Sequence, residues 1–332
     1  MSRVYLSIDQ GTTSSRAIVF NLDTGDIIAH AQKEFTLYFP NSGWVEHDGD
    51  EIWDSVCSVA NQALLEAEKA GANVVGIGIT NQRETTLIWD RKSGTPIHRA
   101  IVWQDRRTSK QCQALIANGR EDEIADRAGL VIDPYFSASK IAWILDNVDG
   151  ARARAEKGEL AFGTIETFLI WRLTNGERHI SDATNASRTS LLNIKTAKWD
   201  EKLCALFNVP MAVLPEITDC AGNLGSAKAG LTKQLPILSA IGDQQSAAVG
   251  QACFYPGAVK ATFGTGCFVI LNTGEQIVKS SNRLLTTIGL QINQKQTYAM
   301  EGSIFIAGAV VQWLRDGIGL LDDASQSEKI AS

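Results

Sequence analysis

The segment YLSIDQGTTSSRAIVF, residues Tyr5 to Phe20, has a turn of small polar residues between two apolar stretches. The apolar stretches, residues 4–8 and 16–20, predict two short strands. The turn, residues 9–15, contains an acid, a glutamine, a glycine and four hydroxyl residues, and it is longer than the roughly two to five residues of an ordinary hairpin. Its backbone N–H groups and hydroxyls suit a polyphosphate, and its glycine allows close approach. The pattern predicts either a phosphate-binding hairpin or a polar surface hairpin.

Asp9 stands at the end of the first predicted strand, beside this turn. Mg²⁺ prefers oxygen ligands and keeps several waters, so a carboxylate next to bound phosphates is a suitable ligand. The chain has no G-x-x-x-x-G-K-[ST] motif and no complete G-x-G-x-x-G motif. The turn is therefore neither a P-loop nor a Rossmann fingerprint.

Strand and helix patterns alternate outward from this hairpin. IIAHAQKEF predicts a third strand, residues 50–70 predict a helix that ends at Gly71, and NVVGIGIT predicts a central strand covered on both faces. Further helices are expected at residues 109–117, 137–147 and 166–173. The order β-β-β-α-β-α is typical of an α/β protein with a mixed sheet.

The opening pattern recurs near residue 240. LPILSAIGDQQSAAVGQ predicts a strand, a corner and a helix, and AVKATFGTGCFVILNTGEQ predicts a strand, a Gly-Thr-Gly turn and a strand. More strands, LLTTIGLQI and TYAMEG, and a helix over residues 304–314 follow. The repeat indicates an internal duplication, in which two facing turns clamp one triphosphate. The second copy is far shorter than the first, so we expect the front part of a longer architecture; a small second domain is the alternative.

The composition narrows the classes of partner. A net charge of −6 argues against nucleic acid or an anionic membrane as a partner. No apolar run reaches the roughly 18 residues of a membrane span, and the N-terminus has no signal-peptide pattern. The six cysteines form no C-x-x-C pair, which favours reduced thiols and a cytoplasmic location.

Eight motifs, in this order, resemble the FGGY family of carbohydrate kinases, and among them the members that phosphorylate glycerol. They are DQGTTSSRA, GITNQRETT, AIVWQDRRT, GLVIDPYFSASK, FGTIETFLIWRLT, DATNASRT, GDQQSA and FGTGCF. The resemblance implies the actin-like, RNase H-like ATPase fold, with two similar domains around an ATP cleft. It implies an N-terminal domain over residues 1–252 and the start of a C-terminal domain, incomplete here, over residues 253–332.

The resemblance also implies a nucleotide site. The first turn would bind phosphates, the Gly-Thr-Gly turn would oppose it, and a later helix would approach the nucleoside. The residues assigned to ATP are Gly11, Thr12, Thr13, Ser14, Arg16, Gly264, Thr265, Gly308 and Gln312. Those assigned to Mg²⁺ are Asp9 and Asp243.

Arg83 and Glu84, in NQRET, follow a predicted buried strand, where open α/β sheets bind ligands. A fork of donors beside an acceptor can satisfy neighbouring hydroxyls, because each hydroxyl both donates and accepts. From spacing alone a local ion pair explains them equally well; the resemblance makes them polyol ligands. It further implies Trp103 and Phe268 as apolar walls and Tyr135 as a third polar contact.

Asp243 follows an apolar strand and opens a helix in AIGDQQSA. Position alone is also consistent with a helix N-cap. The resemblance implies that Asp243 is the general base for a primary hydroxyl and that Gln244 contacts the terminal hydroxyl. Because phosphoryl transfer depends mainly on positioning and charge neutralisation, the base need not be strong.

Together these observations predict ATP- and Mg²⁺-dependent phosphorylation of glycerol to sn-glycerol 3-phosphate. Three alternatives stay open: a kinase of another polyol or sugar in the same family, an inactive polyol-binding fragment or interaction module, and a filament-forming or chaperone-type ATPase. Expected partners are glycerol and ATP or ADP, without nucleic acid or a membrane span, and association between copies of the chain is left open.

Overall fold

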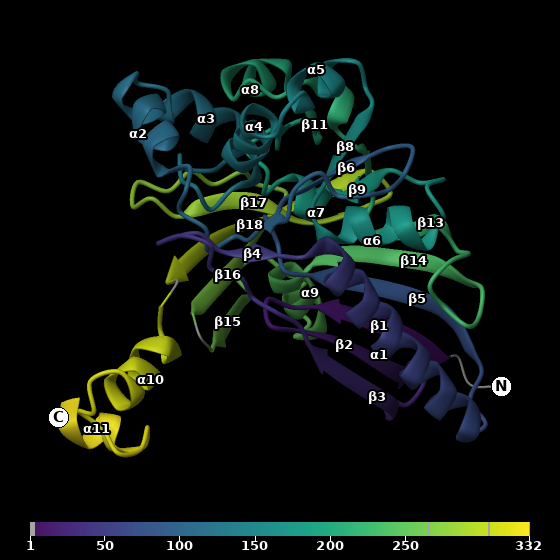
Figure 1. Ribbon diagram of the computed structural model, residues 1–332. Coiled ribbons are helices and arrows are strands. Elements are labelled where there is room, and N and C mark those ends of the chain that lie inside the picture. The colour runs from purple at the N-terminus through teal and green to yellow at the C-terminus, as the bar shows by residue number, and fades with distance from the viewer. Residues whose placement is uncertain (1–3, 265, 305, 332) are drawn as a thin grey trace.

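Two β-sheets dominate the computed structural model, which describes residues 4–264, 266–304 and 306–331 (Figure 1). The first sheet is mixed, with strand order β13-β14-β5-β1-β2-β3, and the second is antiparallel, with order β15-β16-β18-β17. The strands of the first sheet are β1 (Val4–Gln10), β2 (Ser14–Asn21), β3 (Ile27–Glu34), β5 (Val74–Asn81), β13 (Ala221–Ala227) and β14 (Leu235–Gly242). Those of the second are β15 (Val259–Phe263), β16 (Cys267–Gly274), β17 (Leu285–Ile292) and β18 (Lys295–Ile304).

The opening hairpin is tighter than the sequence suggests. Strands β1 and β2 pair antiparallel as far as Gln10 and Ser15, and the Gly11 N–H donates to the Ser14 carbonyl at 3.0 Å. Asp9 therefore lies within β1, and the loop shortens to residues 11–13. Strands β15 and β16 form a second antiparallel hairpin, paired as far as Phe263 and Cys267.

Helix α1 (Gly49–Lys69) covers one face of the first sheet. Its apolar side, which includes Ile52, Val56 and Val59, packs with strand residues in one buried core. Asp48 caps it by accepting from the N–H groups of Asp50 and Glu51. Helix α6 (Ile165–Leu173) contributes to the same core (Figure 1).

The prediction that the NVVGIGIT strand is covered on both faces holds only in part. Strand β5 is central in its sheet, and Ile77 and Ile79 are buried in the core with α1 and α6, whereas Val75 is 39 % exposed. Val75 departs from the usual alternation of a strand because the pairing of β5 with β1 shifts in register between Val74 and Ile77.

Smaller elements build a second core around α4 (Ser137–Asn147). The helices α2 (Ser109–Ala117) and α4 have the bounds that the sequence predicts. Other elements were not predicted: β4 (Glu46–His47), β6 (Leu87–Asp90), β7 (Ala100–Ile101), α3 (Glu121–Ala128), α5 (Ala151–Glu156), β8 (Leu160–Gly163), β9 (Ile180–Asp182), α7 (Ala183–Ala186), β10 (Leu192–Asn193), β11 (Lys198–Trp199), α8 (Glu201–Leu206), a 3₁₀ turn (Met211–Val213) and β12 (Glu216–Thr218). Most are too short for a clear periodic signal.

Helix α9 (Asp243–Gly250) connects the sheets, because it contacts β14 and β5 of the first and β15 and β16 of the second. The prediction of a helix from residue 304 needs correction. Ile304 is still in β18, paired with Cys267, and helix α10 (Gly308–Asp316) begins four residues later, followed by α11 (Gln326–Ala331). In Figure 1, α10 and α11 project from the body of the molecule.

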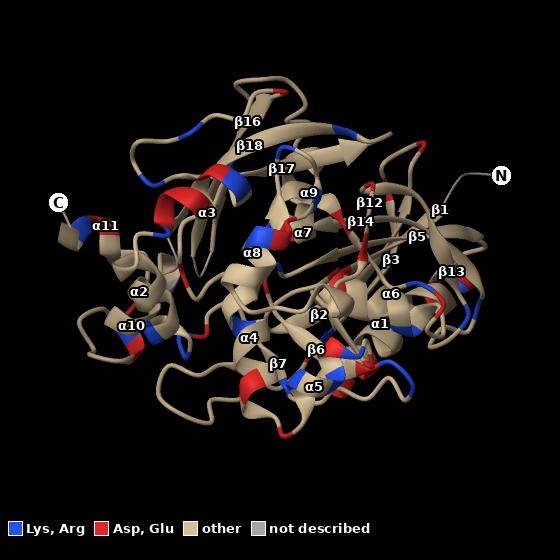
Figure 2. Cartoon of the chain, turned by 90° about the horizontal axis from the view of Figure 1, so that it is seen from above, with Lys and Arg blue, Asp and Glu red and all other residues tan. Residues whose placement is uncertain are grey.

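Basic and acidic residues are interspersed over helices such as α3, α8 and α10 (Figure 2), in keeping with the modest net charge of −6. None of the helices within the described ranges combines the length and the apolar character that a membrane crossing requires.

Candidate active site

One small cavity, of about 170 Å³, brings together all seven residues that the sequence predicts for the polyol. They reach it from separate parts of the chain: the loop after β5, the segment after β7, the loop before α4, the start of α9 and strand β16. The lining consists of Arg83, Glu84, Trp103, Tyr135, Asp243, Gln244 and Phe268, with Thr12, Thr262, Gly264 and Gly266.

Glu84 is held in an unusual backbone conformation. Its φ of 60° lies in the left-handed region, which costs a non-glycine residue on the order of 1–2 kcal/mol. Its carbonyl accepts hydrogen bonds from the hydroxyls of Ser137 and Thr86, both at 3.0 Å, which helps to fix this geometry. The Glu84 carboxylate is buried and accepts from Arg188 Nε at 2.6 Å.

The guanidinium of Arg83 differs from the expected free fork of donors. Its Nη1 and Nη2 atoms donate to Glu301 at 2.6 and 2.9 Å, and they also contact Gln245 and Tyr135. Its Nε atom lies 3.3 Å from Asp243 Oδ1. The terminal atoms of Arg83 are therefore engaged by other side chains, whereas its Nε atom pairs with Asp243.

Asp243 is the first residue of α9, and the N-cap is Gly242. The N-cap is therefore the residue before Asp243, and not Asp243 itself. The Gly242 N–H donates to Thr184 Oγ1 at 2.9 Å, which anchors the corner, and Asp243 Oδ1 accepts from the Gln244 N–H at 2.7 Å. Desolvation raises the pKa of Asp243 above its ordinary value, and Arg83 partly opposes that shift. Its side chain is still 38 % exposed, on the cavity.

Three aromatic rings form one wall of the cavity. Trp103 packs edge-to-face against Tyr135 and Phe268, with ring centroids 5.8 and 6.0 Å apart. Trp103 Nε1 donates to Thr12 Oγ1 at 2.9 Å, so the wall touches the β1–β2 turn. The loop that carries Tyr135 is fixed by buried Lys140, whose Nζ donates to the carbonyls of residues 134–136.

Sequence reasoning missed four side chains around this cavity. Lys260 Nζ donates to Gln244 Oε1 at 2.8 Å, and Gln245, Arg188 and Glu301 surround Arg83 and Glu84. Arg188 lies within the motif DATNASRT, which could have drawn attention to it. Lys260 lies in the short strand VKATF, and Glu301 follows the apolar residues Ala299 and Met300 in β18; a charged residue beside such apolar neighbours was the available signal.

The residues predicted for the nucleotide are only partly brought together. Thr12 and Gly264 line the cavity, and the Gly308 N–H donates to the Gly264 carbonyl at 2.9 Å. Gly11 and Thr13 belong to the same turn as Thr12, while Ser14 is buried and its Oγ accepts from Gln32. Gln312 is exposed on α10 and does not line the cavity. Thr265 lies outside the described residues.

Asp9 lies in β1, and its Oδ2 is 3.5 Å from Arg16 Nη2. Burial raises the pKa of Asp9, against the opposing effect of Arg16. A desolvated carboxylate behind a donor-rich turn fits a hydrated Mg²⁺ between protein and phosphates. Over the described parts of the chain, no group of three or more His, Cys, Asp or Glu side chains is arranged to hold a metal ion.

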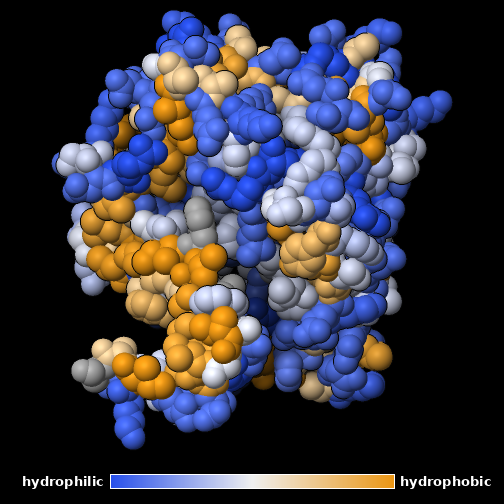
Figure 3. Space-filling model, turned by 60° about the vertical axis from the view of Figure 1, so that its left-hand side comes forward, coloured by the Kyte–Doolittle hydropathy of each residue, from blue (hydrophilic) through white to orange (hydrophobic). Residues whose placement is uncertain are grey.

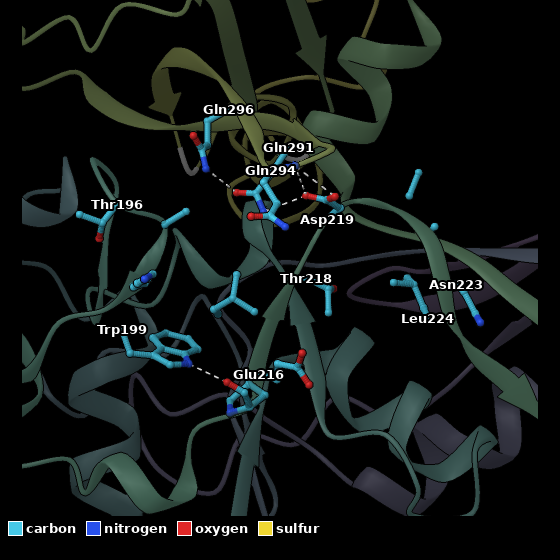
Figure 4. A pocket seen from close by; sticks show the side chains of 16 residues that line it. Thr196, Trp199, Glu216, Thr218, Asp219, Asn223, Leu224, Gln291, Gln294 and Gln296 are labelled. Atoms are coloured by element: carbon cyan, nitrogen blue, oxygen red, sulfur yellow. Dashed lines mark hydrogen bonds between the residues drawn. The ribbon is translucent and has the colours of Figure 1, made fainter.

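A larger cavity, of about 820 Å³, lies elsewhere and contains none of the predicted residues. It is bounded by the β10–β11 hairpin, β12, β13 and the β17–β18 turn. Figure 4 shows Gln291, near the end of β17, and Gln294, in the β17–β18 turn, beside Asp219, and Gln291 Nε2 donates to Asp219 at 3.0 Å. Volume alone would select this cavity, whereas the convergence of acid, base and aromatic groups selects the smaller one.

The paired sheets and the two facing hairpin turns beside the cavity define the class: a protein of the actin-like ATPase fold. Comparison with known proteins gives the family. The profile of the N-terminal domain of the FGGY family of carbohydrate kinases matches residues 4–250, and that of its C-terminal domain matches residues 259–332. The chain belongs to the FGGY family of carbohydrate kinases.

Curated relatives are similar over the whole chain. Glycerol kinase 1 of Pseudomonas aeruginosa is 59 % identical over 332 residues, which are 100 % of this chain and 67 % of that protein. The glycerol kinase of Rhodospirillum centenum is 58 % identical over 328 residues, 98 % of this chain and 66 % of that protein. The chain thus spans about two thirds of the length of these relatives.

Solved structures agree with the fold. A Plasmodium falciparum glycerol kinase crystallised with ADP superposes with a TM-score of 0.92 at 39 % identity, covering 99 % of this chain and 66 % of that one. A xylulose kinase from Rhodospirillum rubrum superposes with a TM-score of 0.83 at 23 % identity, covering 94 % and 62 %. The second likeness concerns the fold alone.

Proposed function

We propose that this protein phosphorylates glycerol to sn-glycerol 3-phosphate with ATP and Mg²⁺. The observation that carries the proposal is the convergence of seven side chains from distant segments on one cavity of about 170 Å³. That volume is well below the roughly 300–1,000 Å³ of sites for drug-sized ligands, so it suits a small polyol. The similar curated proteins named above are glycerol kinases.

In the proposed complex, hydroxyls of glycerol bind between the Nε edge of Arg83 and the carboxylate of Glu84, and Tyr135 provides a third polar contact. Trp103 and Phe268 pack against the carbon chain. Lys260 already donates to Gln244 Oε1, which orients the amide so that its Nε2 can donate toward the substrate and Asp243.

Asp243 serves as the general base in this proposal. Its carboxylate accepts the proton of the primary hydroxyl while that oxygen attacks the γ-phosphorus, and the bond from phosphorus to the bridging oxygen of ADP breaks in line. A pKa raised by burial suits this role, because a stronger base accepts a proton more readily.

The phosphates would bind between the turns that contain Thr12 and Gly264. Gly11, Thr13, Ser14 and Arg16 complete the first side, and Thr265, Gly308 and Gln312 the second. Asp9 and Asp243 would hold Mg²⁺, which neutralises phosphate charge when bound. The hydrogen bond from Trp103 to Thr12 supports close approach of the two substrates, because it joins the polyol wall to the phosphate turn.

The test is a phosphorylation assay of the purified chain with glycerol, ATP and Mg²⁺, in which sn-glycerol 3-phosphate is identified enzymatically. Faster turnover of a pentulose or longer polyol would instead favour another carbohydrate kinase. Glycerol binding by calorimetry without turnover would favour an inactive polyol-binding protein. ATP-dependent sedimentation without polyol binding would favour a filament-forming ATPase.

We also propose two features of organisation. The domain boundary would fall near residue 252, since α9 ends at Gly250 and β15 starts at Val259. A cytoplasmic location is proposed because all six cysteines are free thiols.

A further inference from the structure

Glu301 lies on β18 of the second sheet, yet its fully buried carboxylate binds two arginines of the first part of the chain. Oε2 accepts from Arg83 Nη1 at 2.6 Å, and Oε1 accepts from Arg83 Nη2 at 2.9 Å and from Arg188 Nη2 at 3.1 Å. Ser303 Oγ adds a donor to Oε1 at 3.1 Å. The contact with Arg83 is bidentate, which is the geometry that fixes both position and plane of a guanidinium.

Arg83, Glu84, Arg188 and Glu301 form one buried cluster of two arginines and two carboxyl groups, in which Arg188 also donates to Glu84. Burial alone would raise the pKa of Glu301, but Arg188 and Arg83 outweigh it and hold the pKa at about 2. Glu301 is therefore ionised at neutral pH. Removing one charge of such a cluster leaves its partner uncompensated in a buried place.

The geometry gives Arg83 two distinct sides. Its terminal atoms are engaged by Glu301, Gln245 and Tyr135, whereas Nε lies between Asp243 Oδ1, at 3.3 Å, and Glu84 Oε1, at 4.0 Å. Without Glu301, the guanidinium would be drawn to the nearest remaining carboxylates, Asp243 and Glu84. Both are residues to which we assign polyol contacts.

We propose that Glu301 is a positioning residue through which the second sheet assembles the polyol site. Its bidentate contact engages the Nη1 and Nη2 atoms of Arg83, so that the Nε edge, which lies 3.3 Å from Asp243 Oδ1, is the part of the guanidinium left for the ligand. This proposal rests on the proposed function. It means that both sheets contribute to the polyol site and that the affinity for the polyol depends on the position of β18.

The alternative is that Glu301 merely ties the two sheets together. Separate binding measurements with the two ligands distinguish these roles, because a structural tie would affect both ligands, whereas a positioning residue acts on the polyol. Removing the Glu301 charge takes away the acceptor that fixes the position and plane of the Arg83 guanidinium, so the polyol contact loses its geometry.

The experiment compares Glu301→Gln with the unmodified chain by calorimetry with glycerol and, separately, with ADP–Mg²⁺. We expect the glycerol Kd to rise at least about tenfold and the ADP Kd to change less than about twofold. In turnover, the KM for glycerol should rise while the KM for ATP stays nearly unchanged. Glu301→Asp keeps the charge but shortens the reach; it should recover part of the affinity, and it serves as the test variant if Glu301→Gln does not fold.

Glu166→Gln is the matched control, since Glu166 is equally buried but does not line the cavity. It should leave the ratio of the two Kd values unchanged. Equal weakening of both ligands by Glu301→Gln would overturn the positioning role. Failure of the unmodified chain to bind glycerol would instead overturn the proposed function, so the two failures are distinguishable.

Discussion

At the scale of single residues, the chemistry depends on how the cavity alters Asp243. This carboxylate is desolvated, faces Arg83 at 3.3 Å and begins a helix that contacts both sheets. Its position just inside the helix, beyond the N-cap Gly242, lets it serve the cavity while its Oδ1 still accepts the Gln244 N–H. Asparagine at this position keeps the size and that acceptor but cannot take a proton.

Asp243→Asn should therefore lower kcat by about 10²–10⁴-fold, the usual loss for a general base, while glycerol still binds by calorimetry. In the unmodified protein kcat should fall with acidification, and the midpoint should lie above pH 3.8, because the raised pKa of Asp243 means that its proton is regained at a higher pH. A variant that keeps a tenth or more of its kcat would reduce Asp243 to a structural residue.

Glu166 gives a second test at this scale, one of stability. It is buried beside Asp182, and desolvation raises its pKa from 4.5 to about 7. Between these values the folded chain holds a proton that the unfolded chain has lost, so this group lowers the free energy of unfolding as pH rises through the window.

Glu166→Gln removes that dependence. The stability of the variant minus that of the unmodified chain should increase between pH 5 and pH 8, by on the order of 1–3 kcal/mol. Buried His47 and His179, whose pKa values are lowered to about 4, act in the opposite direction but are common to both proteins. Urea titrations at several pH values measure the difference; a constant difference would contradict the buried titration of Glu166.

At the scale of elements, the end of helix α3 packs closely against strand β17 of the second sheet. Gly129 ends α3 with φ of +74°, and its carbonyl accepts from the Thr286 N–H at 2.8 Å. A Cβ at this position would lie 2.2 Å from the Thr286 carbonyl oxygen. Backbone atoms of a paired strand cannot easily move aside.

Gly129→Ala should lower the free energy of unfolding by more than about 2 kcal/mol, since left-handed strain and a backbone clash combine. Gly119→Ala is the matched control, because Gly119 has φ of +69° with open space around its Cβ. That variant should lose only about 1 kcal/mol. Chemical denaturation of both variants gives the comparison, and equal losses would mean that the contact with Thr286 contributes little.

At the scale of the whole molecule, apolar surface is unevenly distributed. It gathers toward the lower left of Figure 3, on the side where α10 projects. Phe263 on the edge strand β15 is 80 % exposed, and Ile306 and Trp313 are 65 % and 55 % exposed. Exposed edge strands and large apolar patches favour association.

We expect this chain, expressed alone, to self-associate at micromolar concentration in sedimentation velocity experiments. Phe263→Glu combined with Trp313→Glu should shift it toward monomer. Phe39→Glu is the control, since Phe39 is a comparably exposed phenylalanine, 66 %, in the loop after β3 rather than on β15 or α10. A monomer at every concentration, or an equal effect of the control, would contradict association through this surface.

The sequence by itself determined the features that depend on neighbouring residues. The spacing of apolar residues predicts helices α2 and α4 with their observed bounds, and the ordered motifs predict seven side chains that the structure brings to one cavity. Turns, strand ends and helix starts are local, so short patterns encode them.

Only the tertiary structure decided which charges meet. Arg83 and Glu301 are 218 positions apart, and their contact depends on how β18 is seated against the loop after β5. The partial covering of β5 also depends on tertiary packing. So does the length of β18, which extends to Ile304 because β16 pairs with it there. Burial and long-range pairing are set by the summed packing of many elements, and no short window of sequence contains that information.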